Sequence, residues 1–440
     1  MNSSVEAKPA RNPMLAIFTT VFIDMLGFGI LIPVYPLLIS EGSPFRVTPE
    51  GWSFTQGLIM LGWLQGIFPL FIFLAAPILG QMSDRYGRRP VLAVSIFGTA
   101  IGYAIFAIGI STANIPLLFI GRALDGITGG NQAVAQAAIG DVSTNENRAK
   151  NFGMIGAAFG LGFILGPYIG GRLSGPDKSF YGLFNTPDWF SATTPFWFAA
   201  ILSLGNCALI LGLFPETLKQ KVHNGRLHFG KAVSNVVEGF RSDRLRVVLG
   251  STFFFNAGFT FFTTFFGVYL RNNFGFDEGK TGDYFAIVGL FIALSQAVLV
   301  GRVAKFLPDW KVLRFSLFGT GLVMFVYFFS PTDTTLYLYL TIPFFTFFNG
   351  LSMANMGSLV SRSAEMGRQG EAMGIFSSVQ SLAQVPASIL VGYIATSITS
   401  ATPLIVSGSC ISAGGLLFLL AFRPKYVNDA PAVSGTAPVH

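Results

Sequence analysis

Charged side chains stand inside long apolar runs of this sequence at three positions, Asp24, Arg122 and Asp125. Removing a charge from water is costly, so ionisable residues in such surroundings usually belong to an ion path or a binding site. Asp24 and Asp125 each lie ten residues from the start of their apolar run. At about 1.5 Å of rise per helical residue, both carboxyl groups would lie about 15 Å deep. Two carboxyl groups at that depth predict a site that takes up and releases protons or cations.

Arg122 precedes Asp125 by three residues, so both fall on one face of a helix. Loss of hydration disfavours the charged form of either carboxyl group, whereas the adjacent guanidinium favours the charged form of Asp125. We therefore expect Asp24 and Asp125 to titrate differently, and we take Asp24, Arg122 and Asp125 as proton-coupling residues. The alternative is that Arg122 and Asp125 form a neutralised pair that only fixes helix packing.

A stripe of polar residues continues the face of Arg122 and Asp125 through Gly129, Gln132 and Gln136 at helical spacing. Such a face predicts a bundle interior or a water-filled cavity, because lipid cannot hydrate it. Further candidates for a substrate cavity lie in other runs: Tyr35, Asn256, Gln296, Asn349 and Gln384. For each of them the alternative is a hydrogen bond between packed helices. Eight phenylalanines crowd residues 247–270, and we expect most of them to face lipid, with a pocket for a flat apolar ligand as the alternative.

The composition predicts that these residues are carried by membrane-spanning helices. Only 11% of the 440 residues are charged and 52% are hydrophobic, whereas a soluble domain carries about 25% charged residues. A span needs about 20 apolar residues. Twelve runs qualify: 14–39, 55–77, 91–110, 115–139, 151–172, 195–214, 247–270, 282–302, 311–330, 335–357, 371–397 and 402–421. The predicted fold is an all-α membrane protein with 12 transmembrane helices.

The chain divides into two six-helix parts. Gly153 and Gly171 in the fifth run align with Gly374 and Gly392 in the eleventh at one constant offset, which indicates internal repeats. Most Lys and Arg residues fall in alternate loops, which predicts that both termini are cytoplasmic. The expected organisation is a cytoplasmic tail at 1–13, a six-helix bundle at 14–214, a cytoplasmic linker at 215–246, a second bundle at 247–421 and a cytoplasmic tail at 422–440. In transporters of this layout the substrate site lies at the repeat interface near mid-membrane.

Other function classes are disfavoured by what the sequence holds. The net charge of +7 does not indicate nucleic-acid binding, because the basic residues are spread over short loops. Two cysteines, Cys207 and Cys410, lie in apolar runs, and only three histidines occur. We therefore expect no metal and no cofactor. Within the predicted spans we find no nucleophile–base pair or phosphate loop, so we do not expect an enzyme.

The loop after the second run reads Gly80-Gln-Met-Ser-Asp84-Arg85-Tyr-Gly87-Arg88-Arg89-Pro90. It resembles the signature loop of the major facilitator superfamily. The segment Gly162-Phe-Ile-Leu-Gly166-Pro167-Tyr-Ile-Gly170-Gly171 resembles a motif of that family's antiporter branch. The first half is most similar to drug/proton antiporters of the tetracycline-efflux type, including Asp24 followed by Gly27 and Pro33, and Gly126 with Gly129.

The resemblance implies a conformational latch at the cytoplasmic face, formed by Gly80, Asp84, Arg85, Gly87, Arg88 and Arg89, which Arg148 or Lys150 could join. It also implies a helix-five motif of Gly162, Gly166, Pro167, Gly170 and Gly171. The second-half loop, Gly301-Arg302-Val-Ala-Lys305, lacks the acid and the second glycine of the signature. Helices eight and nine lack evident counterparts of the acidic and histidine residues of tetracycline antiporters, so tetracycline itself is not the expected substrate.

The resulting prediction is a secondary active transporter in the plasma (inner) membrane, which exports small amphipathic compounds or drugs in exchange for protons by alternating access. The expected partners are the small-molecule substrate, protons and the lipid bilayer, with the monomer as the functional unit. Sodium in place of protons stays open. The alternative function is a proton-coupled symporter or facilitator for a nutrient such as a sugar or an organic acid, since two buried acids serve symport equally well.

Overall fold

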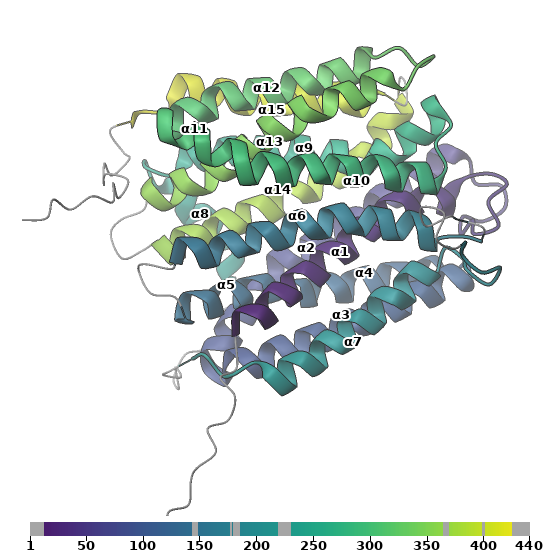
Figure 1. Cartoon of the computed structure of the whole chain (residues 1–440), viewed down its shortest axis with the longest axis horizontal. Coiled ribbons are helices and arrows are strands. Elements are labelled where there is room, and N and C mark those ends of the chain that lie inside the picture. The colour runs from purple at the N-terminus through teal and green to yellow at the C-terminus, as the bar shows by residue number, and fades with distance from the viewer. Residues whose placement is uncertain are drawn as a thin grey trace, which may run out of the picture.

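The computed structural model describes residues 13–142, 148–176, 178, 185–218, 230–363, 369–397 and 401–424. In some of these helices, for example at 148–157, the side chains lie outside the description. The fold is all-helical (Figure 1). The first part of the chain forms α1 (Pro13–Ile39), α2 (Phe54–Tyr86), α3 (Arg88–Ser111), α4 (Ile115–Gly129), α5 (Asn131–Val142), α6 (Arg148–Leu173) and α7 (Thr194–Leu213).

A short helix, α8 (Lys231–Arg241), follows within the predicted linker. The second part forms α9 (Arg246–Phe274), α10 (Glu278–Leu294), the π-helix η1 (Ser295–Val300), α11 (Gly301–Phe306), α12 (Asp309–Phe329), α13 (Leu336–Ser363), α14 (Gln369–Ser397) and α15 (Thr402–Ala421). The division into two bundles with the predicted boundaries stays a prediction.

Each of the twelve predicted spans coincides with one helix or with consecutive helices. Among the described residues, nine helices are long and apolar enough to cross a membrane. The fourth predicted span is divided at Gly130 into α4 and α5, of 15 and 12 residues. The eighth is a 17-residue helix that continues as the π-helix η1. The all-helical membrane fold is confirmed, whereas twelve crossings and the orientation of the termini stay predictions.

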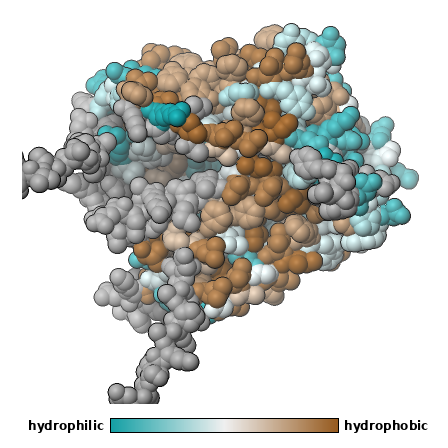
Figure 2. Space-filling model, in the orientation of Figure 1, coloured by the Kyte–Doolittle hydropathy of each residue, from teal (hydrophilic) through white to brown (hydrophobic). Residues whose placement is uncertain are grey.

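The two ends of the bundle differ in what they carry. α1 begins and α15 ends at the left in Figure 1, which we name the terminal end, and the loop after α1 lies at the opposite, distal end. Brown hydrophobic side chains cover the middle of the face in Figure 2, and teal side chains gather at the distal end on the right. An apolar belt between polar ends is the surface expected of a protein in a bilayer.

Helices of the two parts meet by close backbone approach in the distal half of the molecule. A Cβ added to Gly392 of α14 would lie 2.5 Å from the carbonyl oxygen of Leu58 in α2. One added to Gly171 of α6 would lie 2.2 Å from that of Glu278 in α10. Gly171 and Gly392 are the pair that the repeat alignment matches, so the two crossings are equivalent. Both bring the halves together toward the distal end.

The phenylalanines of α9 form a core, which corrects the expectation that most of them face lipid. Phe255, Phe261, Phe262, Phe265 and Phe266 are buried, and Phe254 alone among the eight is classed as exposed. The ring centroids of Phe262 and Phe266 lie 4.4 Å apart. Beside them, the hydroxyl groups of Tyr284 and Tyr327 are 2.9 Å apart. Composition alone misled here, because an aromatic run suits a packed interior and a lipid surface equally well.

Replacing Gly392 by Leu should destabilise the protein, because the new side chain would meet the α2 backbone, which cannot move aside cheaply. Overpacking of this kind costs about 1–3 kcal/mol. Thermal unfolding in detergent measures the effect. The matched control is Gly374→Leu in the same helix, where an added Cβ has open space. Equal melting temperatures for the two variants would contradict the close crossing.

Candidate transport site

The buried ion pair of Arg122 and Asp125 lies in α4, with 2.7 Å between Nη1 and Oδ2. Arg122 is 2% exposed and Asp125 is 5% exposed. The guanidinium also lies over the ring of Phe68 from α2, 4.1 Å from its centroid. Its Nε and Nη2 are buried without a hydrogen-bond partner in the described part of the chain. The pair is therefore nearly dry and incompletely hydrogen-bonded, which lowers stability. Ionisable groups kept in a span at such a cost are candidates for a functional role.

Asp24 lies on α1 and is partly buried. Its Oδ2 is buried and has no hydrogen-bond partner within the described residues. The amide of Asn131 lies in hydrogen-bonding proximity to the carboxyl group, and Asp125 is near enough to repel its charge. The structure thus brings together the three residues predicted for proton coupling, from α1 and α4, and leaves Asp24 with a free acceptor.

Asn131 is a member of this site that the sequence analysis missed. It is 0% exposed, and its Oδ1 and Nδ2 meet no hydrogen-bond geometry with the described residues, although it lies beside Asp24. It opens α5 directly after Gly130, where the helix is interrupted. The polar residue after the Gly129-Gly130 pair was a signal that could have found it.

Tyr35, predicted to line the substrate cavity, is buried and donates a hydrogen bond to Gln65 Oε1 at 2.9 Å. Tyr103 of α3 lies directly against Gly27, where an added Cβ would overlap its hydroxyl oxygen. Arg122 and Asp125 both interact electrostatically with Tyr35 and Tyr103. Tyr35 and Tyr103 therefore lie near the ion pair of Arg122 and Asp125.

The remaining cavity candidates are spread over several helices. Gln132 and Gln136 of α5 and Gln384 of α14 are partly buried, and Gln296 of η1 is exposed. Asn256 is buried and donates to the carbonyl of Thr252 in its own helix. Their role in a cavity stays a prediction.

Asn349 has a polar neighbourhood across two helices. Its Oδ1 is buried without a partner in the described structure. The adjacent Gly350 brings α13 close to Ser295 and Gln296, since an added Cβ would lie 3.3 Å from Ser295 Oγ and 3.4 Å from Gln296 Nε2. π-Helical turns such as η1 are often found at functional sites.

The helix-five motif packs α6 against the helix that carries Asp24. Cβ atoms added to Gly162, Gly166 and Gly170 would lie 2.5–2.6 Å from atoms of Met25, Leu26 and Ile30 in α1. On its other side α6 meets α10, where a Cβ on Gly282 would lie 2.7 Å from the Pro167 carbonyl oxygen. α6 therefore joins the helix of Asp24 to the second half.

The predicted latch residues form a network within the first half. Arg88 pairs with Asp84 at 2.6 Å and with Asp141 at 3.0 Å. Gly87 has φ 109°, which L-residues rarely adopt, and the turn there presents the backbone N–H groups of Arg88 and Arg89 to Glu216. Asp141 and Glu216 were missed by the sequence analysis, because both lie far from the loop along the chain.

Other latch residues are placed at the rim of this network. Arg85 is exposed and lies over Tyr86, with 5.4 Å to the ring centroid. The Arg89 guanidinium donates to the carbonyl of Leu211 in α7. Gly80 lies in α2 with open space around it. The side chains of Arg148 and Lys150 lie outside the described residues. The described contacts of Asp84 are to its own half, and its side chain is 47% exposed.

An equivalent network with reversed signs lies in the second half. Asp309, at the start of α12, pairs with Arg362 of α13 at 3.3 Å and accepts a hydrogen bond from Ser358. Arg88 and Asp309 are separated by 221 residues, as are Asp141 and Arg362, and as are Gly171 and Gly392. At the offset of Asp84 the second half has Lys305, so the acid of this network, Asp309, stands in the place of Arg88.

Ion pairs also link the two halves at the distal end. Arg172 of α6 contacts both carboxylate oxygens of Asp283 in α10 at 2.6 Å. Lys178 lies 3.2 Å from Glu278, which Arg271 contacts at 2.7 Å. We name these five residues the distal ionic cluster. Together with the glycine crossings, the cluster joins the two halves at the distal end.

The model of the Major Facilitator Superfamily matches residues 17–388. The chain belongs to this superfamily. Tetracycline resistance protein class C of Escherichia coli is 29% identical over 416 residues, which covers 93% of this chain and 96% of that protein. The chain is thus a multi-pass membrane transporter and not an enzyme.

Solved structures of the superfamily share the fold. The human organic anion transporter MFSD10 (TETRAN) has a TM-score of 0.71 at 21% identity, covering 94% of this chain and 100% of that chain. A D-xylose-proton symporter has a TM-score of 0.71 at 17% identity, covering 94% and 98%. At these identities the likeness concerns the fold alone.

Reversing the charge of Asp309 or Arg362 singly should destabilise the protein, and exchanging both should restore it. The partial exposure of Arg362 limits the pair to about 1 kcal/mol. Thermal unfolding of Asp309→Arg, Arg362→Asp and the double variant gives the coupling energy. If the effects of the two single variants simply add in the double variant, the pair contributes nothing.

Proposed function

We propose that the protein exports small amphipathic compounds in exchange for protons by alternating access. The observation that carries the proposal is the contrast between two carboxyl groups in one half. Asp125 is neutralised by Arg122 at 2.7 Å, while Asp24 Oδ2 has no partner in the described structure. Asp24 therefore offers an unpaired acceptor to a proton, whereas the carboxylate of Asp125 is paired with a guanidinium.

In the proposed transport cycle, this conformation is the state in which the distal end is closed. With the glycine crossings and the distal ionic cluster formed, exchange with solvent proceeds from the terminal end. The distribution of Lys and Arg over the loops supports a cytoplasmic location for that end. In this state Asp24 releases its proton to the cytoplasm and the substrate enters. In the opposite state the substrate leaves and a proton from outside reloads Asp24.

The route from Asp24 to the distal end runs through α6. A change of charge on Asp24 alters the favoured position of α1, on which Gly162, Gly166 and Gly170 of α6 pack. α6 carries Arg172 at its far end, so a shift of α6 acts directly on the ion pair with Asp283. Both networks at the terminal end keep each half rigid while the halves move apart.

The substrate class rests on the relatives and on the surroundings of the site. The relative from Escherichia coli is named for tetracycline resistance, which supports drug efflux. The neutral polar residues Gln296 and Asn349 would offer hydrogen-bonding groups to an amphipathic molecule. Nutrient symport is the competing function, because the acids serve either direction.

Asp24→Asn should abolish proton-coupled transport, because an amide cannot carry the proton. In sealed vesicles with a preset pH gradient, a pH-sensitive dye should report proton movement when a compound from a drug panel is added. We expect the Asp24→Asn rate to fall at least about tenfold, which corresponds to ~1.4 kcal/mol. Asp125→Asn should also reduce transport, since it leaves Arg122 buried without its partner.

The control is Asp333→Asn, an exposed aspartate of the distal loop, which should transport like the unmodified protein. Full proton coupling by Asp24→Asn would remove Asp24 from the mechanism. Proton movement triggered by sugars or organic acids, and by no drug, would replace export with nutrient symport.

Arg172→Glu should open the distal end by repulsion with Asp283, and Arg172→Glu with Asp283→Arg should close it again. Spin labels at Glu41→Cys and Thr332→Cys, with Cys207 and Cys410 replaced by Ser, report the distance between the distal loops. The long-distance population should rise about fivefold in the single variant, which is roughly 1 kcal/mol. An unchanged distance distribution would show that the cluster does not hold this end.

A further inference from the structure

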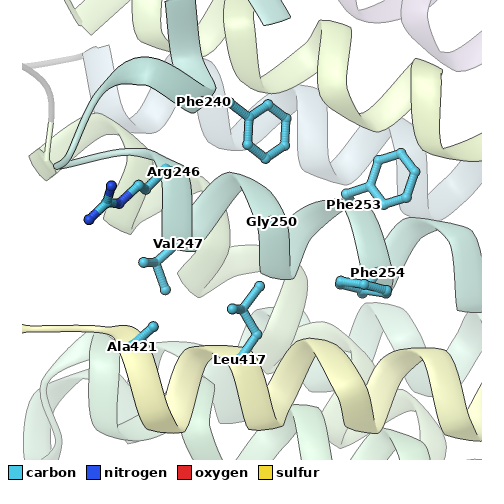
Figure 3. Close-up of a pocket in the computed structure, with 8 residues that line it drawn as sticks. All are labelled: Phe240, Arg246, Val247, Gly250, Phe253, Phe254, Leu417 and Ala421. Carbon is cyan, nitrogen blue, oxygen red and sulfur yellow. The ribbon is translucent and has the colours of Figure 1, made fainter. Parts of the chain in front are cut away.

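A groove on the outside of the second half lies between the linker helix and two spans. It has a volume of about 520 Å³ and is lined by residues of α8, α9 and α15: Phe240, Arg246, Val247, Gly250, Phe253, Phe254, Leu417 and Ala421. In Figure 3 the apolar side chains Phe240, Phe253, Phe254 and Leu417 surround the groove, and Arg246 extends toward the terminal end. Gly250 forms part of its floor. The groove takes no part in the proposed transport site.

The groove continues the surface that faces the hydrocarbon of the bilayer. Phe254 of α9 and Leu416, Leu419 and Leu420 of α15 are exposed large apolar residues. α8 adds an exposed apolar stripe of Val233, Val237 and Phe240, spaced by four and three residues on one face. A helix with such a stripe at the end of the spans lies in the membrane interface. Acyl chains are therefore the medium into which the groove opens.

The terminal end of the groove is charged, whereas the rest of its lining is apolar. Arg241 ends α8, Arg244 lies in the turn that follows, and Arg246 begins α9. Arg423 follows Ala421, and all four arginines are exposed. The acids that face this rim are Asp243, which pairs with Arg246 at 3.0 Å, and Glu238 of α8. Both partners of that pair are more than half exposed, so water or a phosphate oxygen can reach Arg246. Four arginines against two acids favour an anionic headgroup.

We propose that this groove binds one phospholipid with an anionic headgroup from the leaflet at the terminal end. Arg246 contacts the phosphate, and an acyl chain lies over Gly250 between Phe253, Phe254 and Leu417. Because Phe240 belongs to the linker and Leu417 to the last span, the bound lipid ties the linker helix to the second half. A lipid lost from this position would free α8 from α9 and α15.

Native mass spectrometry of the purified protein, titrated with phosphatidylglycerol or phosphatidylcholine of identical chains, tests the site. The unmodified protein should retain one phosphatidylglycerol with at least about fivefold preference, and Arg246→Gln should reduce the preference about fivefold, the factor typical of one interfacial charge. Gly250→Leu should abolish retention of this lipid, because its side chain fills the floor against Leu417. Ala421→Trp blocks the groove from its exposed rim and should act in the same way.

The matched controls are Arg85→Gln, an exposed arginine outside the groove, and Gly205→Leu in α7, where an added Cβ has open space. Both should retain the lipid as the unmodified protein does. Equal retention of phosphatidylglycerol by the groove variants and the controls would overturn the proposal, as would equal retention of the two lipids. Displacement of the lipid by a transported compound, one molecule for one, would assign the groove to substrate instead.

Discussion

The close approach of α6 to both of its neighbours is the contact on which the rest of the arrangement depends. On one side its glycines admit the backbone of α1 at the level of Asp24, and on the other Gly171 admits that of α10. Without a hydrophobic driving force between helices in lipid, such close packing is a main source of helix association. A helix held this tightly on both sides cannot shift against one half without disturbing the other. α6 thereby connects the helix that carries Asp24 with α10 of the second half.

Ion pairs at the two ends of the bundle connect different parts of the molecule. At the terminal end the described pairs join helices of the same half, Arg88 with Asp141 and Asp309 with Arg362. At the distal end Arg172 and Lys178 pair across the halves with Asp283 and Glu278. Partly exposed ion pairs contribute about 1 kcal/mol each or less. They are therefore strong enough to bias a conformation and weak enough to be exchanged in every cycle.

The sequence was sufficient for the helices and for the centre of the site. Every predicted apolar run coincides with one or more helices, and the three-residue spacing of Arg122 and Asp125 agrees with the ion pair in α4. Partners distant along the chain were not predictable, since nothing local links Glu216 to the backbone of Arg88 or Asn131 to Asp24. The rings of α9 were placed wrongly for a related reason. In a membrane protein the interior and the exterior of the bundle are both apolar. An aromatic run therefore does not indicate whether its side chains face the interior or the lipid.

The repeat relation explains why the halves carry the same scaffold and different chemistry. Glycine crossings and terminal networks recur at the same offset of 221 residues, with the signs of the charges reversed in the second half. A pair that joins two helices is equally effective in either polarity, so this part of the scaffold was free to invert. A proton carrier has no such freedom, because it must change its protonation state in the site, which a carboxyl group can do and an arginine cannot. At the offset of Asp125 the second half has Thr346, and at that of Asp24 it has Leu245. In the proposed mechanism the proton chemistry is confined to α1 and α4, and α6 connects that single ionisable centre to both halves.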